Sequence, residues 1–118
     1  MDDRIAKWLF DIQLAGTEIQ TFIDQYKIES VIDYSQNIIL KKAIERNLEI
    51  IGEAVNRIVK RDNTFLETLP ESRSIIGLRN IIIHAYDGIS DEMIWSVVNQ
   101  HLPVLLKQVD QVMGNWKN

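Results

Sequence analysis

The feature that most constrains the fold is a three-four spacing of apolar residues that recurs along most of the chain. The first stripe lies within residues 2–24 and consists of Ile5, Leu9, Ile12, Gly16, Ile19 and Ile23. The second lies within residues 33–60 and includes Ile44, Leu48, Ile51, Val55 and Ile58. Because an α-helix turns once in about 3.6 residues, each stripe occupies one face of an amphipathic helix. Residues 25–32 lack this period and are predicted to connect the two helices.

The second half of the chain is predicted to form two further helices. Residues 61–70 are expected to be a loop or one short turn ahead of the next helix. Residues 71–84 contain several β-branched residues, which favour a strand, but no second strand candidate exists to pair with them. A helix over 71–84 is therefore predicted.

The last helix is predicted to follow a turn at Asp87 and Gly88, with Ser90 as its N-cap. Its apolar stripe consists of Ile94, Val98, Leu102, Leu105, Val109 and Val112. Pro103 lies inside this stripe and lacks a backbone N–H, so a kink or break is expected near residues 101–102.

Four amphipathic helices with short connections bury their stripes most simply as an up-down four-helix bundle. We expect an all-α fold with long antiparallel helices and a single domain over residues 1–118. Five Gly and two Pro are too few for the many turns of an all-β fold, and the absence of Cys excludes disulfides and thiolate metal sites. Gly16 and Gly52 lie in or beside the stripes, where Gly permits close approach of another backbone.

The charge pattern argues against a general nucleic-acid binder, because 13 basic and 17 acidic side chains give a net charge of −4. No apolar run approaches the length of about 20 residues that a membrane helix needs. The N-terminus has no apolar segment typical of a signal peptide, so a cytoplasmic location is expected. Neither His84 nor His101 lies in a metal-ligand motif, and the Gly residues are isolated, so no metal or cofactor is predicted.

One cluster combines several chemically active side chains within eight residues, at positions 79–86: Arg79, Asn80, His84 and Tyr86, with three Ile between Asn80 and His84. A structural interpretation pairs Arg79 with a carboxylate such as Glu53. A functional interpretation uses Arg79 to stabilise charge on a transition state and His84 as a general acid or base.

This octet resembles the Arg-Asn-x-x-x-His-x-Tyr signature of HEPN-domain nucleases and of their toxin branch, HepT. Residues 46–54, residues 75–78, Gly88 and Trp95 are also similar to that branch, so the likeness spans roughly residues 1–112. The resemblance implies a HEPN-like bundle and a metal-independent endoribonuclease that leaves a 2′,3′-cyclic phosphate and a 5′-hydroxyl. It also implies that Arg79 and His84 are catalytic and that Asn80 supports them.

The resemblance further implies the partners of such a toxin. They are an RNA substrate, a second copy of the chain that completes a composite site, and a minimal nucleotidyltransferase (MNT) antitoxin. The antitoxin would transfer AMP to Tyr86, and the added charge and bulk would block RNA.

Helical geometry bears on how Arg79 and His84 meet. Five residues along an ideal helix turn by about 500°, so these side chains point about 140° apart. Either the helix ends before His84, or two chains pool their motifs in a symmetric dimer. A dimer would also bring two imidazoles together, one as acid and one as base.

Other candidates have a structural and a functional interpretation. The compact basic cluster of Arg57, Lys60 and Arg61 is a solvated helix end or a set of RNA-backbone contacts. His101 is expected at a surface or boundary position. Core or interface positions are expected for Trp8, Trp95 and Trp116.

Three functions therefore remain open from the sequence. The first is the ribonuclease toxin. The second is a non-enzymatic helical helper subunit of a nucleotidyltransferase, which would bind nucleotide or RNA with Arg79 as a phosphate clamp. The third is a dimeric interaction protein without chemistry.

Overall fold

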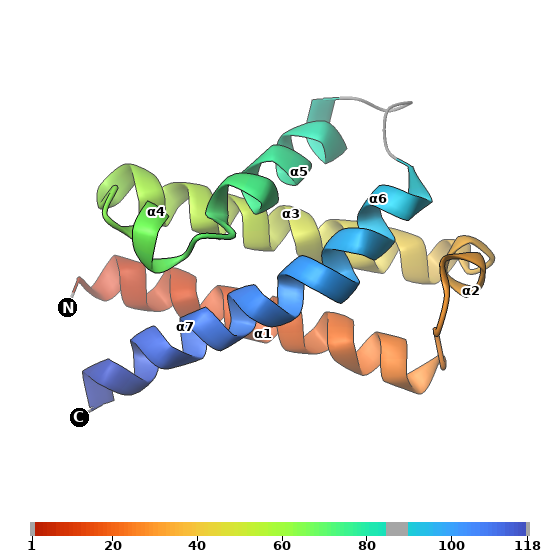
Figure 1. The fold of residues 1–118 in the computed structure, drawn as a ribbon, viewed down its shortest axis with the longest axis horizontal. Helices are drawn as coiled ribbons and strands as arrows, with labels where there is room; N and C mark the ends of the chain where they lie inside the picture. Colours follow the sequence, from red (N-terminus) through yellow and green to blue (C-terminus); the bar gives the residue numbers. More distant parts are fainter. Residues whose placement is uncertain (1, 85–89, 118) are drawn as a thin grey trace.

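The computed structural model describes residues 2–84 and 90–117, and all regular elements of those residues are helices (Figure 1). This confirms the all-α prediction. The helices are α1 (Asp3–Gln25), α2 (Val31–Ser35), α3 (Ile38–Arg61), α4 (Phe65–Thr68), α5 (Ser72–His84), α6 (Asp91–Ser96), the π-helical turn η1 (Val97–His101) and α7 (Leu102–Lys117).

The long helices form an up-down bundle in which α1 and α3 run antiparallel and share the largest contact (Figure 1). The helix α5 packs on α3, and α7 packs on α1. Gly16 allows the close approach of α7, because a Cβ at this position would collide with Leu106. The core lies between the long helices and includes the apolar residues of the stripes predicted from the sequence.

The first connection is more structured than predicted. A single helix from residue 33 is wrong, because α2 ends at Ser35 and α3 begins at Ile38. Two side-chain caps explain the break: Ser30 Oγ accepts the N–H of Asp33 (3.2 Å), and Asn37 Oδ1 accepts the N–H of Leu40 (3.0 Å). Short polar side chains favour such caps over helix interiors.

The predictions for residues 61–84 are confirmed. One short helix, α4, lies in the segment 61–70, and α5 occupies the stretch whose β-branched residues favoured a strand. Tertiary packing on α3 outweighs the strand preference of those residues.

The start of the last helix is also as predicted, since Ser90 Oγ accepts the N–H of Met93 (3.1 Å). The turn predicted at Asp87 and Gly88 lies outside the described residues.

The irregularity expected near Pro103 is confirmed as a π-helical turn. The N–H of Leu102 donates to the carbonyl of Val97, five residues earlier, and regular α-helix resumes at Leu102. Pro103 has no N–H for the α-helical bond to residue 99, so the wider turn lies where that bond is missing. In the described part of the chain, no helix is long and apolar enough to cross a membrane.

Candidate functional site

Arg79 is held in place by α3. Its Cβ lies so close to Gly52 that a Cβ on Gly52 would collide with it. Its Nη2 donates to Glu53 Oε2 (2.5 Å), and its Nη1 donates to Asn80 Oδ1 (3.0 Å). The predicted pairing of Arg79 with Glu53 is therefore confirmed, and Gly52 and Glu53 fix the stem and the head of Arg79 respectively.

Glu53 also holds a second arginine. Its other oxygen, Oε1, accepts the Nε–H of Arg57 (3.0 Å) one helical turn further along α3. The Nε of Arg79 is buried and has no hydrogen-bond partner among the described residues. The result is a continuous chain of polar contacts that runs from Arg57 through Glu53 and Arg79 to Asn80.

Arg57, Glu53 and Arg79 of these contacts line a groove of about 470 Å³. Residues of α1 and α5 line the groove along with α3, so that residues 46–54 and Arg79, both noted for their family likeness, meet in one place. The lining residues are Trp8, Asp11, Arg46, Glu49, Ile50, Glu53, Ala54, Arg57, Arg79 and Ile83.

Acidic and basic side chains alternate in the groove, and several are paired. Arg46 donates to Glu49 (3.2 Å), and Asp11 accepts from Lys7, one turn earlier on α1 and outside the lining (2.8 Å). The charges that line the groove therefore nearly cancel. Its capacity to bind an anion depends on the arginine N–H groups that are not already bonded to other side chains of the protein.

His84 is the last residue of α5 and is exposed. Because α5 continues through His84, the alternative in which the helix ends before this residue is wrong. The divergence of about 140° between Arg79 and His84 therefore applies to the folded chain. His84 is not among the residues that line the groove.

The basic cluster on α3 divides into different environments. Arg57 faces the groove, whereas Arg61 donates its Nε–H to Asp2 Oδ2 (2.6 Å) and ties the end of α3 to the start of α1. This contact is the main cause of the lowered pKa of Asp2. Lys60 is exposed in the last turn of α3.

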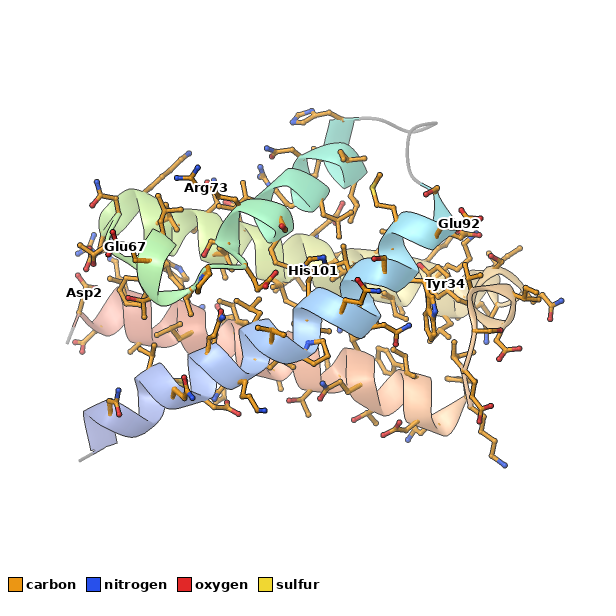
Figure 2. All side chains as sticks on the ribbon, viewed as in Figure 1. Asp2, Tyr34, Glu67, Arg73, Glu92 and His101 are labelled. Carbon is orange, nitrogen blue, oxygen red and sulfur yellow. The ribbon has the colours of Figure 1, made fainter. Side chains whose placement is uncertain are left out.

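Of the remaining candidates, Trp8 lines the groove and His101 and Trp95 do not, while the side chain of Trp116 lies outside the described part of the chain. His101 is half-buried near the middle of the bundle, with Nδ1 2.6 Å from Glu71 Oε2, which confirms its predicted boundary position (Figure 2). Trp95 packs against the buried Tyr34, with ring centroids 6.2 Å apart. Tyr86 lies outside the described residues. No group of three potential metal ligands occurs among the residues that the structure describes.

The sequence analysis singled out Glu53, Arg57 and Trp8 among the groove residues but not Asp11, Arg46 or Ile50. Arg46, Ile50, Glu53 and Arg57 are spaced by four, three and four, which is a second stripe on α3 beside the core stripe. That spacing was the available signal for Arg46 and Ile50. The contribution of Trp8 and Asp11 depends on how α1 packs beside α3, which local spacing does not reveal.

An all-α bundle with an Arg-Asn pair and a following His on its third long helix fits the HEPN class. A family model described as "Ribonuclease HepT-like" matches residues 12–112, and the chain belongs to this family.

Relatives agree with this assignment. "Putative RNase MJ1380" of Methanocaldococcus jannaschii is 34% identical over 113 residues, which cover 92% of this chain and 95% of the relative. "Putative RNase TTE0752" of Caldanaerobacter subterraneus is 33% identical and covers 85% and 88% of the two chains. "Probable ribonuclease HepT" of Thermococcus cleftensis is 38% identical over 65 residues, covering 53% and 56%. No solved structure matches the chain significantly.

Proposed function

We propose that this protein is a metal-independent endoribonuclease. The observation that carries the proposal is the fixed guanidinium of Arg79, which lines an open groove and lies on the same helix as an exposed imidazole, His84. Family membership and the names of the relatives support RNA as the substrate.

In the proposed reaction, the ribose 2′-oxygen attacks the adjacent phosphorus, and the bond from phosphorus to the 5′-oxygen breaks. An imidazole of His84 accepts the 2′ proton, and an imidazolium donates a proton to the leaving oxygen. Arg79 stabilises the added negative charge on the phosphoryl oxygens, because a guanidinium matches their geometry with several donors. Asn80 holds the second amino group of Arg79. The products are a 2′,3′-cyclic phosphate and a 5′-hydroxyl.

The central test is cleavage of RNA by purified protein in the presence of a metal chelator. We expect activity to persist with chelator and to fall by at least about 100-fold in His84→Ala, since general acid–base catalysis contributes about 10²–10⁴-fold. His101→Gln is the matched control, because His101 bonds to Glu71 and does not line the groove. Cleavage that needs added divalent metal, or that survives His84→Ala, contradicts the mechanism. RNA binding without cleavage favours the helper-subunit alternative.

We further propose that the active form is a homodimer whose two motifs share one cleft. The support is the divergence of Arg79 and His84 on one uninterrupted helix, together with the partial exposure of the three Ile at 81–83 beside them. Sedimentation at micromolar concentration should give twice the chain mass, and activity per chain should fall on dilution as dimers dissociate. A monomer with undiminished activity per chain contradicts this proposal.

As the toxin of a toxin–antitoxin pair, the protein would be controlled by an MNT-type nucleotidyltransferase that adds AMP to Tyr86. Tyr86 lies two residues after His84, so a bulky anionic group there would compete with an RNA phosphate. Intact-mass spectrometry after incubation with the partner, ATP and magnesium should show AMP increments that are absent in Tyr86→Phe. Increments that persist in this variant, or that leave RNA cleavage unchanged, contradict the control mechanism.

A further inference from the structure

We propose that Arg57 and Arg79 form a two-arginine clamp for one RNA phosphate, and that Glu53 is the positioning residue that holds them side by side. The proposal rests on the ribonuclease function for the identity of the ligand. It adds a second phosphate-binding residue and the group that orients both.

The contacts define the clamp. One carboxylate receives Arg57 Nε on Oε1 (3.0 Å) and Arg79 Nη2 on Oε2 (2.5 Å), so two guanidinium groups from α3 and α5 converge on Glu53. Both arginines line the same groove.

The two arginines keep donors for a ligand after they have bonded to Glu53. A guanidinium carries five N–H donors. Arg57 uses its Nε–H in this contact and retains both terminal amino groups, and its side chain is 56% exposed. Arg79 donates from each terminal amino group to Glu53 or Asn80, and each of those groups keeps a second N–H. The two non-bridging oxygens of a phosphodiester can accept from both arginines at once.

The position of Glu53 explains why a carboxylate is present at a site for an anion. Without it, two like charges would lie next to each other and their flexible side chains would separate. With it, Arg79 is fixed at its stem by Gly52 and at its head by Glu53. The cost is a negative charge close to the RNA phosphate. Loss of the Glu53 charge should therefore strengthen RNA binding. It should also slow cleavage, because the guanidinium of Arg79 is then no longer held in its position.

The test measures binding and cleavage separately on the full-length chain. Binding uses a single-stranded 2′-O-methyl oligoribonucleotide, which lacks the attacking hydroxyl, and cleavage uses the same sequence as RNA. For Glu53→Gln we expect affinity no weaker than wild type and a cleavage rate at least about tenfold lower, because an oriented charged donor contributes about 10²–10³-fold. For Arg57→Ala we expect weaker binding and a slope of log affinity against log salt that is shallower by about 0.7, the loss of one phosphate contact on a single strand.

Two variants remove the same charges elsewhere. Figure 2 shows Glu67 on α4 and Arg73 at the start of α5, and neither residue lines the groove. Glu67→Gln and Arg73→Ala should match wild type in both assays. Thermal melting of every variant separates a local effect from a loss of folding.

Several results overturn the proposal. The first is that Glu53→Gln cleaves RNA at the wild-type rate. The second is that RNA affinity, cleavage rate and melting temperature all fall together in Glu53→Gln. The third is that Arg57→Ala binds the oligoribonucleotide with an unchanged salt slope. If wild-type protein cleaves no RNA, the ribonuclease function fails. In that case the binding assay with the 2′-O-methyl oligoribonucleotide still tests whether the two arginines hold a phosphate. The salt slope of Arg57→Ala and the affinity of Glu53→Gln are the deciding measurements.

Discussion

Two carboxylates join helices at different places in this bundle, and their surroundings differ. Glu53 links α3 to α5 and holds two arginines beside a groove. Asp91 links α6 to α2 and α3, with Oδ2 accepting from Ser35 Oγ (2.7 Å) and Oδ1 lying 3.0 Å from Lys41 Nζ. Tyr34, next to Ser35, lies at the end of the bundle opposite Asp2 (Figure 2).

The difference lies in what the donors can still do. Ser35 has one hydroxyl hydrogen, and it is used by Asp91, while Lys41 is about three-quarters buried in its side chain at 26% exposure. Behind them is the fully buried ring of Tyr34, whose hydroxyl has a pKa raised by burial. The Glu53 contacts instead leave guanidinium N–H groups at an open groove. The number of ion pairs therefore says less about function than the donor capacity that remains after pairing.

The largest effect on this contrast is expected from Gly52→Ala. The added Cβ would collide with the Cβ of Arg79, so α5 must shift away from α3. We expect cleavage to fall by at least about tenfold through loss of Arg79 alignment, and stability to fall by about 1–3 kcal/mol through overpacking. Cleavage assays and urea unfolding measure the two effects.

Gly77→Ala on α5 is the matched control, because a Cβ at Gly77 meets nothing within 4 Å. Replacing a helical Gly by Ala at a free position should stabilise the protein by about 0.4–1 kcal/mol and leave cleavage unchanged. Equal losses in both variants would mean that the Gly52–Arg79 contact has no special role.

A smaller effect, confined to stability, is expected at the other carboxylate. The hydrogen bond from Ser35, aided by Lys41, lowers the pKa of Asp91. Because the pKa of Asp91 is lower in the folded state, its ionised carboxylate stabilises the protein at pH values above its unfolded pKa of about 3.9. This stabilisation is lost as the pH falls through the folded-state pKa. Asp91→Asn should cost about 0.5–1 kcal/mol near pH 7, the upper range for a partly exposed pair. The variant should match wild type more closely at about pH 2.

Urea unfolding of both proteins across this pH range measures the difference. A stability gap that does not narrow in acid would show that the charge of Asp91 is not its source. Cleavage by Asp91→Asn at neutral pH should equal that of wild type, in contrast to Gly52→Ala.

The sequence predicted α1, α3 and α7 because each carries an apolar stripe that a helix buries on one side, whereas α5 was predicted only because its β-branched segment had no second strand to pair with. It missed the break between α2 and α3, because the predicted stripe begins only at Ile44, beyond the break, and the N-caps at Ser30 and Asn37, which start two separate helices, were not recognised. The contact of Arg79 with Glu53 was predicted from residue type. The groove around it was not, since Trp8 reaches it only through the packing of α1 beside α3.

The wide turn at Val97–His101 also affects how this chain tolerates changes in length. The N–H of Leu102 bonds to the carbonyl of Val97, five residues back, so this turn holds one residue more than an α-helical turn. The π-turn absorbs the surplus residue. Deleting that residue would therefore restore regular helix with α6 and α7 in nearly the same register, whereas one further residue added to the regular helix would rotate α6 by about 100° relative to α7. Trp95 would then leave Tyr34, so this helix should tolerate a one-residue deletion at the π-turn far better than an insertion.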